Sequence, residues 1–118
     1  MHRDLILVEA ALKRALQLHK DVDNVGEDNL ANHYAKVWAN AQWAFDLMLR
    51  FELLLKFDGG PSAKAPYKQA RRATGLVASM LKRHALHLQL GEACDYGPQR
   101  GITHLLERAI DEINACES

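Results

Sequence analysis

The stretch from Glu27 to Asp58 contains neither glycine nor proline. Glycine weakens the interior of a helix and proline breaks it, so a stretch of this length without either residue favours one continuous helix. The turn-forming segment DVDNVGED precedes the stretch, and DGGPS follows it. At about 1.5 Å per residue, a helix over 27–58 is about 45 Å long. Any fold of this chain must therefore accommodate one long rod.

Three further segments place apolar residues at alternating steps of three and four, which is typical of one helical face. Segment 4–20 does so with Leu5, Val8, Leu12, Ala15 and His19, and the pattern continues to Val22 just beyond it. Segment 99–115 does so with Ile102, Leu105, Leu106, Ala109, Ile110 and Ile113. Apolar and polar residues nowhere alternate with a period of two, so no strands are expected. The sequence of 118 residues predicts a single all-α domain over 1–118. Its expected form is an antiparallel four-helix bundle with two long central helices (about 27–58 and 63–90) and two shorter outer helices (about 4–20 and 99–115).

Because the helices differ in length, the two short outer helices are expected to cover only part of the two long ones. The outer helices are only about 25 Å long. Helix 4–20 joins 27–58 at its N-terminal end, and helix 99–115 leaves 63–90 at its C-terminal end. Those two ends lie side by side in an antiparallel hairpin, so both short helices are expected to cover the same half of the long pair. The half next to DGGPS is expected to stay bare.

The expected bare half carries FDLMLRFELLLKF, residues 45–57, whose apolar side chains surround the helix axis. The opposing segment SAKAPYKQARRA offers mostly alanine and charge. Covering four exposed apolar side chains is worth about 6–12 kcal/mol before the costs of association, which is the order that micromolar or tighter binding needs. The alternative is that an outer helix angles across the tip, or that the long helix bends. We expect a partner surface at the tip, most simply a second copy of the chain across a twofold axis. The residues of this expected partner surface are Leu49, Phe51, Leu53, Leu54 and Phe57.

Helix 63–90 is unusual in its charge, because no Asp or Glu occurs between Gly59 and Gly91. Its six bases fall within an arc of about 120° on a helical wheel. They are Lys64, Lys68, Arg71, Arg72, Lys82 and Arg83. The opposite side is expected to face the core and comprises Ala70, Ala73, Leu76, Val77, Met80, Leu81, His84 and Leu88.

Three interpretations of this basic stripe remain open. It is a solvated face balanced in part by the acids of 99–115, a docking surface for an acidic protein or a second copy, or a site for nucleic-acid backbone. Fifteen basic and fifteen acidic residues cancel overall, and no helix-turn-helix or zinc module is present, which disfavours nucleic acid. An apolar centre with an Arg-rich rim is typical of protein interfaces. We therefore favour a partner surface in which Lys64, Lys68, Arg71 and Arg72 form the rim of the tip.

Trp43 is expected on the polar side of helix 27–58. An exposed tryptophan often marks an interface, although burial under an outer helix is the equal alternative.

Motifs for chemistry are incomplete. DVDNVGEDNLAN resembles an EF-hand calcium loop, but Asn32 replaces the closing glutamate. Six histidines are present, and His19, His33 and His84 fall on or near expected core faces. The Glu-x-x-His pattern of di-iron bundles is absent, so hydrogen-bonded core histidines are favoured over a metal site. No nucleophile motif or phosphate loop is recognisable, and neither enzymatic activity nor a cofactor is expected.

The remaining expectations concern location and partners. Cys94 and Cys116 lack metal-type spacing and are interpreted as free thiols of a cytoplasmic protein. No stretch is apolar enough for a membrane span, and no membrane partner is expected. The leading hypothesis is a non-enzymatic protein–protein interaction or regulatory module that forms a homodimer. Nucleic-acid binding along helix 63–90 is the alternative, and a metal or small-ligand site among core histidines is the third hypothesis.

Overall fold

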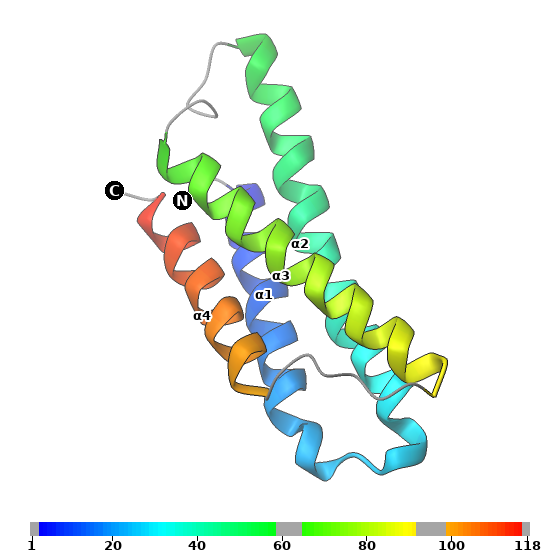
Figure 1. Cartoon of the computed structure of the whole chain (residues 1–118). Coiled ribbons are helices and arrows are strands. Elements are labelled where there is room, and N and C mark those ends of the chain that lie inside the picture. The colour runs from blue at the N-terminus through cyan, green and yellow to red at the C-terminus, as the bar shows by residue number, and fades with distance from the viewer. Residues whose placement is uncertain (1–2, 59–64, 92–98, 117–118) are drawn as a thin grey trace.

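The computed structural model describes residues 3–58, 65–91 and 99–116. These ranges form four α-helices, α1 (Arg3–Lys20), α2 (Leu30–Asp58), α3 (Ala65–Gln89) and α4 (Gln99–Ala115). Two short 3-10 turns, η1 (Asp21–Asn24) and η2 (Glu27–Asn29), join α1 to α2. The part of the chain that is described contains no strand, and the predicted all-α bundle with two long and two shorter helices is confirmed (Figure 1).

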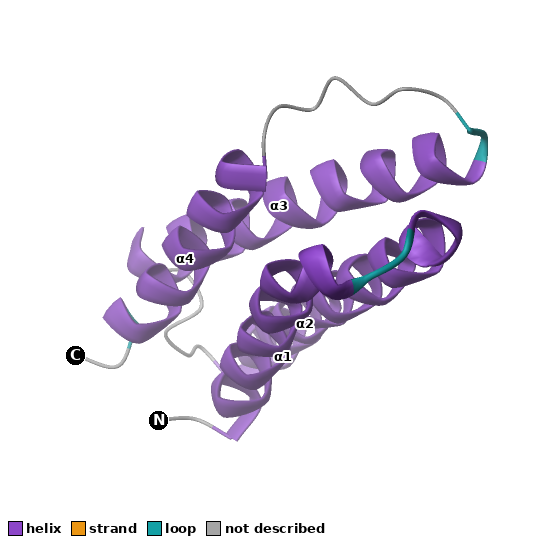
Figure 2. Ribbon diagram, turned by 90° about the horizontal axis from the view of Figure 1, so that it is seen from below, coloured by secondary structure: helices purple, strands orange, loops and turns teal. Residues whose placement is uncertain are grey.

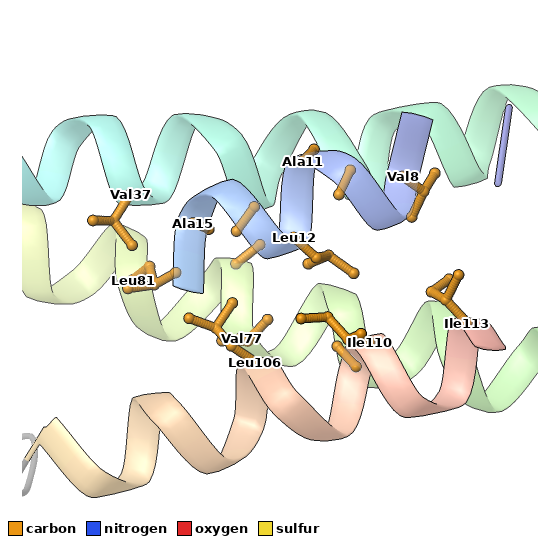
Figure 3. Packing of buried hydrophobic residues seen from close by; sticks show 14 of the residues in the cluster. Val8, Ala11, Leu12, Ala15, Val37, Val77, Leu81, Leu106, Ile110 and Ile113 are labelled. Carbon is orange, nitrogen blue, oxygen red and sulfur yellow. The ribbon is translucent and has the colours of Figure 1, made fainter. Parts of the chain in front are cut away.

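The four helices close into a ring. Each helix packs against the next one in the chain, and α4 packs back against α1. Figure 2 shows α1 beside α2 and α4 beside α3. Every helix supplies fully buried side chains to one shared core, among them Leu12, Val37, Leu81 and Leu106 (Figure 3). The apolar stripe predicted for α1 is entirely buried, and so is that of α4 apart from the half-buried Leu105.

Two hydrogen bonds set the level of α1 along α2. His19 Nδ1 and the Tyr34 hydroxyl lie 3.0 Å apart, and His33 Nε2 donates to the carbonyl oxygen of Leu18. Because the helices are antiparallel, each step back along α1 is one step forward along α2, which puts Arg3 level with about residue 49. The last turns of α2 therefore extend past the first turn of α1, as the helix lengths predict (Figure 1).

The position of α4 differs from the expectation. Ile113 lies at the level of Val8, and Leu106 lies at the level of Val77 (Figure 3). The last turn of α4 is consequently beside the first turns of α3, at the end expected to be bare. The reason is that the apolar stripe of α4 must be buried against α1 as well as α3, and it does so by aligning with the stripe of α1. The end of α3 that extends beyond α4 is the C-terminal one.

Helices α2 and α3 approach each other closely at Gly75. A methyl group on Gly75 would place its carbon 2.8 Å from Cε1 of Phe45, closer than real side chains come. Nearer the start of α3, the Tyr67 hydroxyl donates to the carbonyl oxygen of Met48, and the Tyr67 ring lies 5.7 Å from the Phe51 ring. These contacts extend the cover of α2 by α3 as far as Phe51.

We expect the Gly75→Ala protein to be less stable than the higher helix propensity of alanine alone would predict. Alanine favours a helix interior by up to about 1 kcal/mol over glycine, but here the Phe45 ring must move to admit the methyl group. Gly101→Ala in α4 is the matched control, because nothing lies within 4 Å of its added carbon. Urea unfolding followed by circular dichroism measures both free energies. Equal stabilisation by the two substitutions would contradict the close approach.

Candidate functional site

The side of α3 that points away from the bundle carries bases and large apolar side chains together. Its exposed leucines are Leu76, Leu86 and Leu90, which are 51%, 45% and 72% exposed. Three exposed bases share this side with them, within an arc of about 80°. We call the six residues the α3 outer face, which comprises Lys68, Arg72, Leu76, Arg83, Leu86 and Leu90. Its composition is neither that of a core face nor that of an ordinary solvated face.

The expectation that Leu76 faces the core was wrong. The buried side of α3 is rotated toward Thr74, Ala78 and Ala85 instead. Gly75 and Ala78 are small and let α2 approach, so the flank of α3 that carries them is buried and Leu76 is turned outward.

The tip residues predicted for α2 have different environments. Leu53 is 60% exposed, as predicted, and Leu49 is half-buried. Phe51 is only 5% exposed, so its prediction as a partner-binding residue was wrong. Tyr67 provides the cover, because one aromatic ring from α3 reaches a position that the neighbouring alanines cannot. The side chains of Leu54 and Phe57 lie outside the described part of the structure.

The basic stripe divides into two groups. Lys68, Arg72 and Arg83 are exposed and belong to the α3 outer face. Arg71 is half-buried, and the exposed Lys82 extends toward α2, where its ammonium lies 6.0 Å from the centroid of the Trp38 ring. A cation over an aromatic ring at this distance is weakly attracted to it. Lys64 lies outside the described residues, so its predicted place in the rim is untested.

A polar cluster that the histidine pattern indicated lies where α1, α2 and α3 meet. Tyr34 is its centre, and the rings of His19, His33 and His84 surround it edge to face at 5.8, 5.8 and 4.3 Å between centroids. His19 shares a hydrogen bond with the Tyr34 hydroxyl. The Nδ1 atom of His84 is buried and has no hydrogen-bond partner among the described residues.

The buried environment shifts two of these side chains toward their neutral forms. Burial raises the pKa of Tyr34 to about 12, and the carboxylate of Asp23 adds to the rise. Burial also lowers the pKa of His84, with smaller contributions from His19 and His87. Both shifts follow from the cost of placing a charge where water is excluded.

The described residues do not assemble a metal site. Within the described ranges, no three side chains of His, Cys, Asp or Glu are grouped so that they could hold a metal ion. His19 and His33 bond to a hydroxyl and a main-chain carbonyl, which is the arrangement favoured for core histidines.

Comparison with known proteins found no matching family model, no matching curated protein and no matching solved structure. None of the described helices combines the length and the apolar composition that crossing a membrane requires.

We expect the tyrosine absorbance of the folded protein to titrate partly near pH 12. Tyr34 accounts for this component, since its folded pKa of about 12 lies above the ordinary value of 10.0. Its contribution to stability is complete below pH 10 and is lost as the pH rises toward 12, where only the unfolded chain ionises. Spectrophotometric titration of Tyr34→Phe should lack the late component. If the component that Tyr34→Phe removes is centred near pH 10, the Tyr34 hydroxyl is not buried.

The free energy of unfolding should fall as the pH drops below about 6.5. The folded pKa of His84 is lower than the unfolded one, so the unfolded chain binds more protons between the two values. This part of the stability is complete above the unfolded pKa and is lost on acidification. Urea unfolding over a pH series should give a shallower slope for His84→Phe, which cannot be protonated. Equal slopes in the unaltered protein and in His84→Phe would exclude His84 as the cause.

Proposed function

We propose that this chain is a non-enzymatic protein-interaction module that binds an acidic, amphipathic helix of a partner protein along the α3 outer face. The observation that carries the proposal is the presence of three exposed leucines and three exposed bases on one side of one helix. A single exposed leucine needs no explanation, since folded proteins expose many. Three that share one side of a helix with three bases form a surface with a definite chemical complement.

The shape of this surface supports a helical partner. The α3 outer face runs from Lys68 to Leu90, about 33 Å along the helix axis. A helix with apolar residues at steps of three, four and seven can contact apolar side chains that are spaced by whole helical turns. The bases have no acidic neighbour on α3, whose sequence contains neither Asp nor Glu. Glutamates or aspartates at the edges of the partner's apolar stripe therefore complete the match.

Self-association is a second part of the proposal. α2 extends past α1, and Leu53 near its end is exposed. A second copy of the chain is the simplest cover for this apolar surface. A cytoplasmic location also stays a proposal, supported by the free thiol of Cys116, the state that a reducing compartment maintains.

We expect the protein to bind a labelled helical peptide that has leucines on one face and glutamates beside them. Arg83→Glu should weaken this binding about tenfold, because it replaces an attraction with a repulsion. Leu86→Ser should weaken it through lost apolar contact. Fluorescence anisotropy measures both effects.

Matched controls are available on other helices. Arg108→Glu makes the same charge change on the exposed side of α4, and Leu53→Ser removes an exposed leucine from α2. Both should leave the affinity for the peptide within about twofold. Equal weakening by Arg83→Glu and Arg108→Glu would show that only overall charge matters. Binding of random duplex DNA with a steep salt dependence, in place of the peptide, would favour the nucleic-acid alternative.

A further inference from the structure

The outward side of α2 carries a second line of exposed residues. Trp43 is 54% exposed, Leu53 is exposed, and Asp46 and Arg50 between them are exposed as well. Their spacing of three, four and three residues places all four on one side of the helix. The same helix buries Val37, Ala41, Ala44 and Met48 on its opposite side. We call Trp43, Asp46, Arg50 and Leu53 the α2 strip.

The order of residues in the α2 strip is self-complementary. Trp43 and Leu53 lie at equal distances along the sequence from Met48, one before it and one after it. Asp46 and Arg50 are likewise symmetric about the same position, closer to it. When two copies of a helix pack antiparallel about a twofold axis, residues symmetric about the axis face each other across the interface. An axis at the level of Met48 therefore brings each residue of the strip opposite a residue of complementary chemistry.

We propose that two copies of this chain associate through the α2 strip, with α2 antiparallel to α2 of the partner and the twofold axis at the level of Met48. In this register Asp46 of each copy faces Arg50 of the other, and Trp43 of each copy packs against Leu53 of the other. The interface thus contains two ion pairs and two apolar contacts. This inference rests on the self-association part of the proposed function and adds the face, the orientation and the register.

The charges select the antiparallel orientation. In a parallel pair with the same register, the two Asp46 carboxylates would face each other and so would the two Arg50 guanidinium groups, and like charges held opposite each other are repelled. The carboxylate of Asp46 already accepts one hydrogen bond, from Gln42 Nε2 at 3.1 Å. A carboxylate has about four acceptor positions, so it can still receive an arginine of the second copy.

The geometry of the bundle leaves this face accessible. The α2 strip points away from the core, and the last turns of α2, to which Leu53 belongs, extend past the first turn of α1 (Figure 1). The α3 outer face is on a different helix, so both surfaces are available at once. Each copy of the dimer can then hold its own acidic partner.

Sedimentation equilibrium of the full chain at about 100 µM and below tests the proposal. We expect the unaltered protein to dimerise with a dissociation constant in the micromolar range. Asp46→Lys makes the strip wholly positive and Arg50→Glu makes it wholly negative. Each variant alone should dimerise at least about tenfold more weakly, because both ion pairs become repulsive. An equimolar mixture of the two should recover a heterodimer, since every pair across the interface is again of opposite charge.

The outcomes separate the claims. An unaltered protein that stays monomeric over this range overturns the dimer. A dimer that neither variant weakens overturns the α2 strip as its interface, and two weakened variants that do not recover on mixing overturn the register. Circular dichroism of each variant confirms that the fold is retained, which is expected because both side chains are exposed. Binding of the acidic peptide by the same samples reports on the α3 outer face independently, so either proposal can fail while the other holds.

Discussion

The close packing of α3 against α2 determines which side chains of this protein face solvent. Gly75 admits the ring of Phe45, and Tyr67 lies over Phe51 and bonds to the main chain of α2. A bulkier residue at Gly75 would hold the helices apart and turn α3 about its axis. The small side of α3 is buried as a result, and Leu76 is left outside among the bases.

Because of this packing, charge is distributed unevenly over the surface although the chain as a whole is neutral. Acids and bases that cancel over a sequence do not cancel over a surface when one helix contains no acid. α3 is such a helix, and its rotation places Lys68, Arg72 and Arg83 on the same exposed side as three leucines. α2 differs, because its exposed line carries one acid and one base, Asp46 and Arg50, between Trp43 and Leu53. One helix thus has a surface suited to an acidic partner, and the other has a surface suited to its own copy.

The cluster around Tyr34 is a group of polar side chains at the edge of a mainly apolar core. Its hydrogen bonds fix the level of α1 along α2, which apolar packing alone specifies less strictly. The buried Nδ1 of His84 is the weak point of the cluster, since protonation there would leave a charge without a partner. The same residues that align the helices therefore make the stability of the bundle depend on pH.

Local pattern determined much of this structure. The buried stripes of α1 and α4 and the approximate bounds of all four helices follow from periodicity, glycine and proline, because these act within a few residues of the chain. Only the tertiary structure decided the level of α4, the rotation of α3 and the burial of Phe51. Periodicity defines a buried side only to within part of a turn, and the contour of the neighbouring helix selects among the orientations that remain. A contact between helices such as that of Tyr67 with Phe51 depends on which side chains lie opposite one another, and only the assembled bundle determines that.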